Sequence, residues 1–135
     1  MSTDELLAYA EKRGHTVFYT HLLDNKAISL EDGATYIALS KALHGLEEKE
    51  VFAHELGHCE SGGLYKRHSP YEVMAKAEYR ADKWAYSKLV PVKAVRRAIK
   101  KGVQTPWELA EVFEVSCEYM GKVLVCPRLL CQNES

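Results

Sequence analysis

One short segment of the sequence combines the residue types and the spacing that metal-dependent hydrolysis needs. In His54-Glu-Leu-Gly-His58, two histidines lie four residues apart. Four residues make slightly more than one helical turn, so both imidazoles point the same way and can share one Zn²⁺ at Zn–N distances near 2.0–2.1 Å. Glu55 lies about 100° around the helix, where its carboxylate can reach a water molecule at the metal and act as a general base. The segment therefore predicts a zinc site formed by His54 and His58, with Glu55 as the catalytic residue.

The alternative reading is an accidental pattern on a solvated helix, because shuffled chains of this composition show it in roughly 3% of cases. Its surroundings favour the metal site. Acidic residues such as Glu47 and Glu48 precede it, where they stabilise a helix N-terminus, and Val51 and Phe52 give the helix an apolar side.

A catalytic zinc ion needs a third protein ligand and leaves a fourth position for water. The next predicted helix offers Glu78, with Asp82 four residues later on the same face. The small residues Ala81 and Ala85 would let this helix approach the histidine helix closely. We expect Glu78 to bind the metal and Asp82 to accept a hydrogen bond from a ligating histidine. The alternative is a solvated acidic stripe.

Two other acids compete for the role of third ligand. Glu60 follows His58 by two residues, about 200° around the helix, and so should face away from the metal. Glu72 stands three residues after Ser69, where a capping box would direct its side chain to the helix N-terminus. Both arguments favour Glu78.

These residues must be positioned by an α+β fold. β-branched and aromatic runs, separated by turn signals, predict a small three-stranded antiparallel sheet, and the chain that follows is helical. We expect a zincin-like helical core with the histidine helix, the Glu78 helix and two short C-terminal helices. The boundaries are a first helix over Asp4–Lys12, strands near Thr16–Tyr19, Ala27–Leu30 and Thr35–Leu39, and helices starting near Gly45, Pro70 and Pro106.

Length and composition restrict the class of protein. The chain has 135 residues and a formal net charge of -1, so we expect one domain over residues 1–131, a frayed tail over residues 132–135 and no general attraction to nucleic acid or membranes. An acidic N-terminus and the lack of a long apolar run predict a cytoplasmic protein without a signal peptide or membrane span. Cysteines in that compartment should be free thiols. Cys126 and Cys131 have the spacing of half a metal site, but no second pair completes it.

On these residues the chain resembles the ImmA/IrrE family of metallopeptidases, found in mobile elements, phages and bacterial chromosomes. The resemblance rests on His54-Glu-Leu-Gly-His58, on Glu78-Tyr-Arg-Ala-Asp82 and on the order of the elements, over roughly residues 16–126. It implies zinc bound by His54, His58 and Glu78, catalysis by Glu55, and a protein substrate, namely a helix-turn-helix transcriptional repressor that the enzyme cleaves or inactivates. The predicted loop 62–68, with Tyr65 and His68, matches no family motif for an oxyanion-stabilising residue.

Two rival function classes remain. Leu109–Ser116 reads like the first helix and turn of a helix-turn-helix, which would make the chain a DNA-binding module. The following helix offers Glu118 and Lys122 but no Arg, Asn or Gln for base edges, so we expect no direct nucleic-acid partner. A basic helix carries Lys93, Arg96, Arg97, Lys100 and Lys101, a pattern typical of a solvated face. The other rival is a non-catalytic protein that binds its repressor without cutting it.

Overall fold

A small sheet and the helices around it form the first of two units into which the chain divides, Met1–Ala85 and Tyr86–Ser135. The computed structural model describes residues 1–62, 64–65 and 68–126. The division falls within a helix, and the single domain expected over residues 1–131 stays a prediction. Cys131 and the expected tail, residues 132–135, lie outside the described residues.

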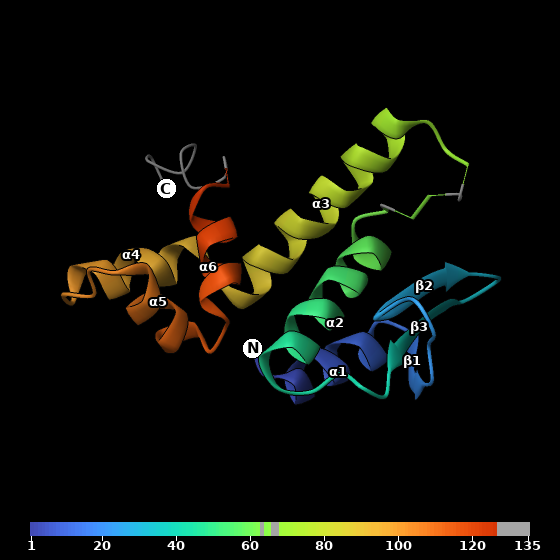
Figure 1. Ribbon diagram of the computed structural model, residues 1–135, viewed down its shortest axis with the longest axis horizontal. Coiled ribbons are helices and arrows are strands. Elements are labelled where there is room, and N and C mark those ends of the chain that lie inside the picture. The colour runs from blue at the N-terminus through green and yellow to red at the C-terminus, as the bar shows by residue number, and fades with distance from the viewer. Residues whose placement is uncertain (63, 66–67, 127–135) are drawn as a thin grey trace. The chain divides into compact units, whose positions relative to one another are not determined.

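The first unit begins with a capped helix and three strands, as the sequence predicts (Figure 1). Ser2 caps the helix by accepting a hydrogen bond from the backbone of Glu5, whose side chain accepts one from Ser2 in return. Gly14, at φ +87°, then turns the chain into the sheet, a conformation that glycine adopts without strain. The elements are α1 (Thr3–Lys12), β1 (His15–Thr20), β2 (Ala27–Glu31) and β3 (Thr35–Ser40).

The sheet is mixed, and the expectation of a purely antiparallel sheet was wrong. Its strand order is β1-β3-β2, in which β2 and β3 pair antiparallel but β1 and β3 pair parallel. Gly33 permits the tight β2–β3 hairpin, whereas the longer link over residues 21–26 carries the chain from β1 to the far side of the sheet. The strand with the most apolar burial takes the centre, since Ile37 and Leu39 are fully buried on β3. Strand β2 is thereby left at an edge.

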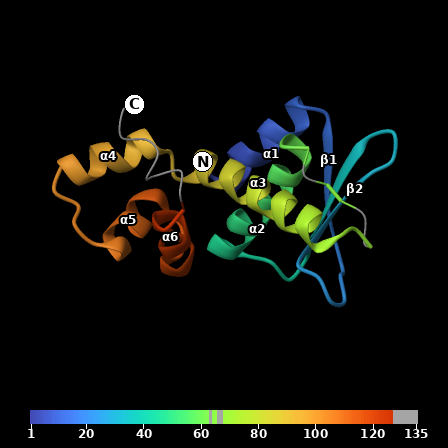
Figure 2. The same ribbon diagram turned by 90° about the horizontal axis from the view of Figure 1, so that it is seen from above.

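The two helices that carry the predicted site residues are α2 (Gly45–Glu60) and α3 (Tyr71–Leu89). The views of Figures 1 and 2 both place α1 and α2 on one side of the sheet. Along α2, Phe52, Ala53 and Leu56 are fully buried and recur at helical spacing, so one side of the helix packs into the core. This packing fixes the direction in which the opposite side of α2 presents its polar residues.

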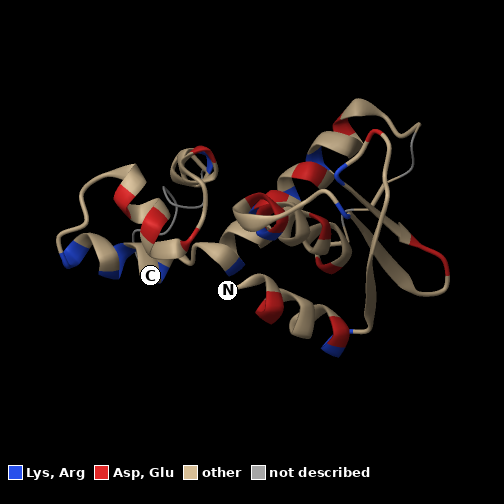
Figure 3. Ribbon diagram, turned by 60° about the horizontal axis from the view of Figure 1, so that its bottom comes forward, with Lys and Arg blue, Asp and Glu red and all other residues tan. Residues whose placement is uncertain are grey.

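Up to residue 126, where its described part ends, the second unit contains the end of α3 and three short helices. They are α4 (Val92–Lys100), α5 (Pro106–Phe113) and α6 (Cys117–Leu124). Thr105 and Ser116 cap α5 and α6 through their side chains, and Glu114 turns the chain between them at φ +54°. The basic residues expected on one helix lie along α4, drawn blue in Figure 3.

Two further expectations can be compared with the structure. Cys59, Cys117 and Cys126 are free thiols among the described residues, as expected. Within the same residues, no helix has the length and apolar character to cross a membrane.

A buried carboxylate ties the end of α2 to the beginning of the chain. Glu60 accepts a hydrogen bond from the Tyr9 hydroxyl at 2.8 Å, lies 2.7 Å from His15 Nε2, and forms an ion pair with Arg13 at 3.1 Å. Burial by itself would raise the pKa of Glu60, but the His15 and Tyr9 hydrogen bonds and the Arg13 charge outweigh it and lower the pKa. The cluster therefore stabilises the charged form of Glu60 in the folded state.

We predict that Glu60→Gln lowers the free energy of unfolding at pH 7 by about 1.5–3 kcal/mol, the range for hydrogen bonds to charged groups. Because the folded pKa of Glu60 lies below the usual glutamate value of 4.5, its contribution is present above that pH and lost as pH falls through the folded pKa. Urea unfolding at several pH values measures both effects. Equal losses of stability at pH 7 and well below the folded pKa would contradict the assignment.

Candidate metal centre

Both histidines of the predicted motif lie on one side of α2. His54 Nε2 and His58 Nε2 are 3.2 Å apart, and the two rings meet nearly edge to face. His58 is buried and His54 is half-buried, so the pair lies at the boundary between core and solvent. Helical periodicity alone brings these two donor atoms together, as the spacing predicts.

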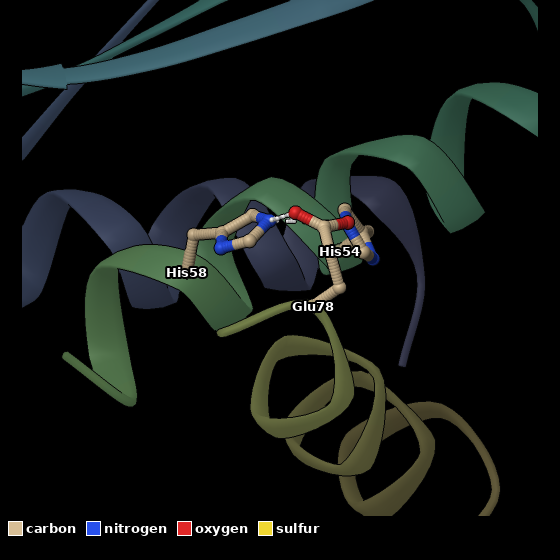
Figure 4. A group of neighbouring side chains, drawn as sticks. All are labelled: His54, His58 and Glu78. Carbon is tan, nitrogen blue, oxygen red and sulfur yellow. Dashed lines mark hydrogen bonds and ion pairs between the residues drawn. The ribbon is translucent and has the colours of Figure 1, made fainter. Parts of the chain in front are cut away.

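The carboxylate of Glu78 reaches the same point from α3 (Figure 4). Its Oε1 lies 3.0 Å from His54 Nε2 and its Oε2 lies 2.9 Å from His58 Nε2. Asp82, one turn further along α3, has its Oδ1 2.8 Å from His54 Nδ1. Two helices thus deliver the three predicted ligands and the predicted hydrogen-bond partner to one place.

A close crossing of α2 and α3 makes this possible. A Cβ atom added to Gly57 would lie 2.5 Å from the backbone carbonyl oxygen of Ala81, well inside normal contact. Ala77, Ala81 and Ala85 are buried and form a stripe of small residues along α3. Gly57 lies between the two histidines in sequence, and Ala81 lies between Glu78 and Asp82, so the contact sets the spacing of all four polar side chains.

Asp82 and Glu78 change the electrostatics of His54. Burial disfavours the charged imidazolium, but the hydrogen bond and charge of Asp82, together with the charges of Glu78 and Glu55, outweigh burial and raise the pKa of His54. Three carboxylates around one imidazole make a site that favours positive charge. A cation bound there would satisfy the same carboxylates.

The donor set fits a zinc ion. Tetrahedral coordination with bonds of 2.0–2.1 Å holds neighbouring donor atoms about 3.3–3.4 Å apart. The separations between the two Nε2 atoms and the Glu78 oxygens, 2.9–3.2 Å, are close to this value. Within the described residues, His54, His58 and Glu78 form a group that could hold a metal ion.

Glu55 lies beside this group, and its side chain forms a hydrogen bond with a residue of the sheet. The Ser29 hydroxyl, on β2, donates a hydrogen bond to Glu55 Oε1 at 2.9 Å, and it lies 3.4 Å from the Glu55 backbone oxygen. A cavity of about 190 Å³ is bounded by residues of β2, α2 and the segment after α2. Its lining consists of Ser29, Glu55, His58, Leu64 and Tyr65. The carboxylate predicted to act as the base therefore borders a space where water and a substrate can enter.

A larger cleft of about 470 Å³ adjoins the same residues. It has apolar and polar walls, made by Ser29, Leu30, Glu31, His58, Cys59, Gly62, Leu64 and Tyr65. Burial raises the pKa of the Cys59 thiol to about 11, so this cysteine is uncharged at neutral pH. The cleft offers room for side chains of a bound peptide next to His58.

Tyr65, in the described part of the loop after α2, contacts two residues of the candidate site. Its hydroxyl donates a hydrogen bond to Glu78 Oε2 at 2.9 Å, and its ring meets that of His58 at a centroid distance of 6.0 Å. Burial, followed by the contact with Glu78, raises the pKa of Tyr65, so the hydroxyl keeps its proton.

The competing acids lie elsewhere. Glu60 binds Tyr9, Arg13 and His15. Glu72 is exposed in the first turn of α3, and its capping role stays a prediction. Cys126 is buried in the second unit, and its partner in the predicted half-site, Cys131, lies outside the described residues.

Comparison with known protein families agrees with this geometry. Residues 5–124 match the Peptidase_M78 family, described as the IrrE N-terminal-like domain. The chain belongs to this family. The M78 match covers α1 from Glu5 onward, the sheet and helices α2 to α6, including the histidine motif and Glu78. The chain is therefore a member of a metallopeptidase family and carries a candidate His-His-Glu metal site. Among curated proteins, none matches the chain.

Sequence reasoning missed Ser29 as a neighbour of the M78 motif and left Tyr65 without a partner. A serine in a strand has no distinctive spacing, and its position opposite Glu55 depends on the strand order of the sheet. The aromatic and hydroxyl character of Tyr65 marked it as a candidate, but its contact with Glu78 depends on the path of the chain after α2.

We predict that Gly57→Ala weakens zinc binding more than it weakens the fold. The added methyl group meets the Ala81 backbone at 2.5 Å and must push α3 away, which separates Glu78 from the histidines. Overpacking costs about 1–3 kcal/mol, and the higher helix propensity of alanine returns about 0.8–1 kcal/mol of that. Zinc affinity, measured by competition with a chelator, and thermal unfolding separate the two effects.

Gly121→Ala is the matched control. Gly121 is also helical, on α6, but an added Cβ atom there meets nothing within 4 Å. We expect it to keep full zinc affinity and to gain stability. Normal zinc affinity in Gly57→Ala would show that the close crossing of α2 and α3 does not determine the spacing of the zinc-binding residues.

Proposed function

We propose that this protein is a zinc-dependent endopeptidase in which His54, His58 and Glu78 bind Zn²⁺ and Glu55 is the general base. The observation that carries the proposal is the convergence of three donor atoms from α2 and α3 beside a cavity that Glu55 also lines. Membership of the M78 metallopeptidase family supports the same reaction class.

The contacts of the residues support a role for each of them in this proposal. A zinc ion held by these ligands would polarise the attacking water and the peptide carbonyl. Glu55 accepts a proton from the water and returns it to the leaving amine. Asp82 accepts a hydrogen bond from His54 Nδ1–H, which leaves the lone pair of Nε2 to bind the metal. Tyr65 donates to Glu78 and so orients the third ligand.

The edge of the sheet gives an extended substrate a place to bind. Backbone hydrogen bonds from Ser40 to Lys26 and from Asp32 to Ala34 flank β2 and set the alternation along it. By this alternation, Ile28 and Leu30 direct their backbone groups toward β3. In the antiparallel alternation, the backbone groups of Ala27, Ser29 and Glu31 then point away from β3, toward an edge that no described strand pairs. A peptide added along this edge would pass the cavity beside Glu55.

For the substrate we propose a helix-turn-helix transcriptional repressor, which the enzyme cleaves or inactivates. The resemblance to the ImmA/IrrE metallopeptidases of phages and mobile elements supports this choice. Repressors bind DNA in the cytoplasm, so this function implies that the protein acts there.

Two other functions have less support. A DNA-binding module would read bases from α6, whose exposed Glu118 and Lys122 lie 3.7 Å apart as an ion pair on that helix. A carboxylate on that face would repel the phosphate backbone. A non-catalytic repressor-binding protein would have no need for Glu55 at the wall of the cavity next to the metal ligands.

We predict that Glu55→Gln keeps one zinc ion per chain but loses at least about 100-fold of its peptidase activity, because an amide cannot accept the proton. The assay incubates the purified protein with a repressor encoded beside its gene and follows the fragments on a gel, with and without chelator. Metal analysis accompanies each sample. Binding of an intact repressor in every sample, with no fragments, would instead support the non-catalytic function.

We predict that Glu78→Ala lowers zinc affinity and abolishes activity while the fold is retained. Glu78 supplies the oxygen ligands, and its side chain is partly exposed, so its removal leaves little strain. Glu72→Ala is the control on the same helix and should cost about 0.5–2 kcal/mol of stability at most, the scale of a lost helix cap. Circular dichroism and zinc titration measure both. Normal zinc binding by Glu78→Ala would refute the assignment of the third ligand.

A further inference from the structure

Ser29, on strand β2, forms a hydrogen bond with the side chain of Glu55. Its hydroxyl oxygen lies 2.9 Å from Glu55 Oε1, across the space between β2 and α2. Both residues line the same cavity of about 190 Å³ with His58. We propose that Ser29 is a positioning residue for the general base, donating to one carboxylate oxygen and leaving the other to exchange protons with the substrate water. This inference rests on the proposed function of Glu55.

The geometry favours the carboxylate over two other groups near the Ser29 hydroxyl, the Glu55 backbone oxygen and the Cys59 side chain. A serine hydroxyl has a single hydrogen, so it can make one strong donation. The carboxylate oxygen at 2.9 Å is within the normal range for such a bond, whereas the Glu55 backbone oxygen at 3.4 Å is beyond it. Donation to an ionised oxygen is also the stronger of the two. The hydroxyl therefore constrains the end of the Glu55 side chain.

Constraint of this side chain matters for proton transfer. A glutamate on a helix has several rotatable bonds, and its carboxylate would otherwise sample positions away from the reacting water. Fixing Oε1 to β2 restricts Oε2 to a short arc beside the cavity. A general base must lie within hydrogen-bond distance of the proton that it takes.

The same bond can survive the reaction. When Oε2 carries the proton, Oε1 remains a hydrogen-bond acceptor, so Ser29 can donate to Oε1 in both states of the carboxyl group. Glu55 thus keeps its place when it holds a proton and can return it to the leaving amine.

A purely structural role is the alternative. Strand β2 packs against α2, and in a purely structural role the Ser29–Glu55 bond would serve that packing alone. The two roles differ in what they change. A structural bond alters stability and, through the cavity shape, substrate binding. A positioning bond alters the turnover rate of the bound substrate.

The first experiment separates kcat from KM with zinc-loaded protein and fluorescein-labelled casein as the probe substrate. We expect Ser29→Ala to bind one zinc ion per chain and to keep KM within about twofold, while kcat falls about 10- to 100-fold, the scale for a displaced catalytic group. Ser29→Thr retains the hydroxyl and should recover most of kcat. Wild-type kcat in Ser29→Ala, or no recovery in Ser29→Thr, would overturn the proposal.

Ser61→Ala is the matched control. The Ser61 hydroxyl bonds to the Gly57 backbone oxygen at 2.6 Å, near the end of α2. The substitution removes the same group from the same region without touching Glu55. We expect wild-type kcat and KM.

The second experiment does not depend on activity. A double-mutant cycle with Ser29→Ala, Glu55→Ala and the pair, carried out on metal-free protein in urea, measures whether the two side chains interact. We expect the midpoint shift of the double variant to be clearly smaller than the sum of the single shifts. Additive shifts would overturn the proposal even if the protein cuts casein.

The outcomes also distinguish this inference from the proposed function. If Glu55→Gln retains full activity, the assignment of the general base fails, whatever Ser29 does. If Glu55→Gln is inactive and Ser29→Ala is not, the function stands and the positioning role fails. If the wild type leaves casein intact, the double-mutant cycle alone decides whether Ser29 holds Glu55.

Discussion

The close crossing of α2 and α3 is the constraint on which the candidate metal centre depends. Gly57 and Ala81 bring the two backbones so near that no side chain larger than hydrogen fits at Gly57. Because Gly57 lies within the histidine motif and Ala81 lies within the Glu78-to-Asp82 segment, the crossing sets the position of the candidate ligands on both helices. The chemistry needs donor atoms from two helices about 3 Å apart, and this packing supplies them.

Electrostatics and packing reinforce each other at this crossing. Glu78, Asp82 and Glu55 surround His54, and their charges outweigh the effect of burial and raise its pKa. Without a bound cation, three carboxylates this close together would repel one another. A bound divalent cation would balance them, while Asp82 and Tyr65 hold the ligands in orientations suited to it.

The sheet contributes through its strand order. An antiparallel meander would place β2 in the middle, with β1 and β3 on either side. In the observed order, β3 takes the centre and β2 becomes an edge that lies against α2. That arrangement brings the Ser29 side chain to Glu55, and among the described residues no strand pairs with the outer edge of β2, where the proposed function would place a substrate. The error in the predicted sheet therefore concerned the strand order that places Ser29 beside Glu55.

The sequence by itself determined what depends on neighbours along the chain. The helix over Gly45–Glu60, its two histidines on one side and the position of Glu55 follow from helical periodicity, and the pairing of Glu78 with Asp82 follows from the same rule. The α+β class and the strand positions also followed from local patterns and turn signals. Tertiary structure decided the rest, because strand order and helix contacts join residues far apart in the sequence. Neither the parallel pairing of β1 with β3 nor the contact of Ser29 with Glu55 has a local signature, since each depends on which surfaces bury the most apolar area together.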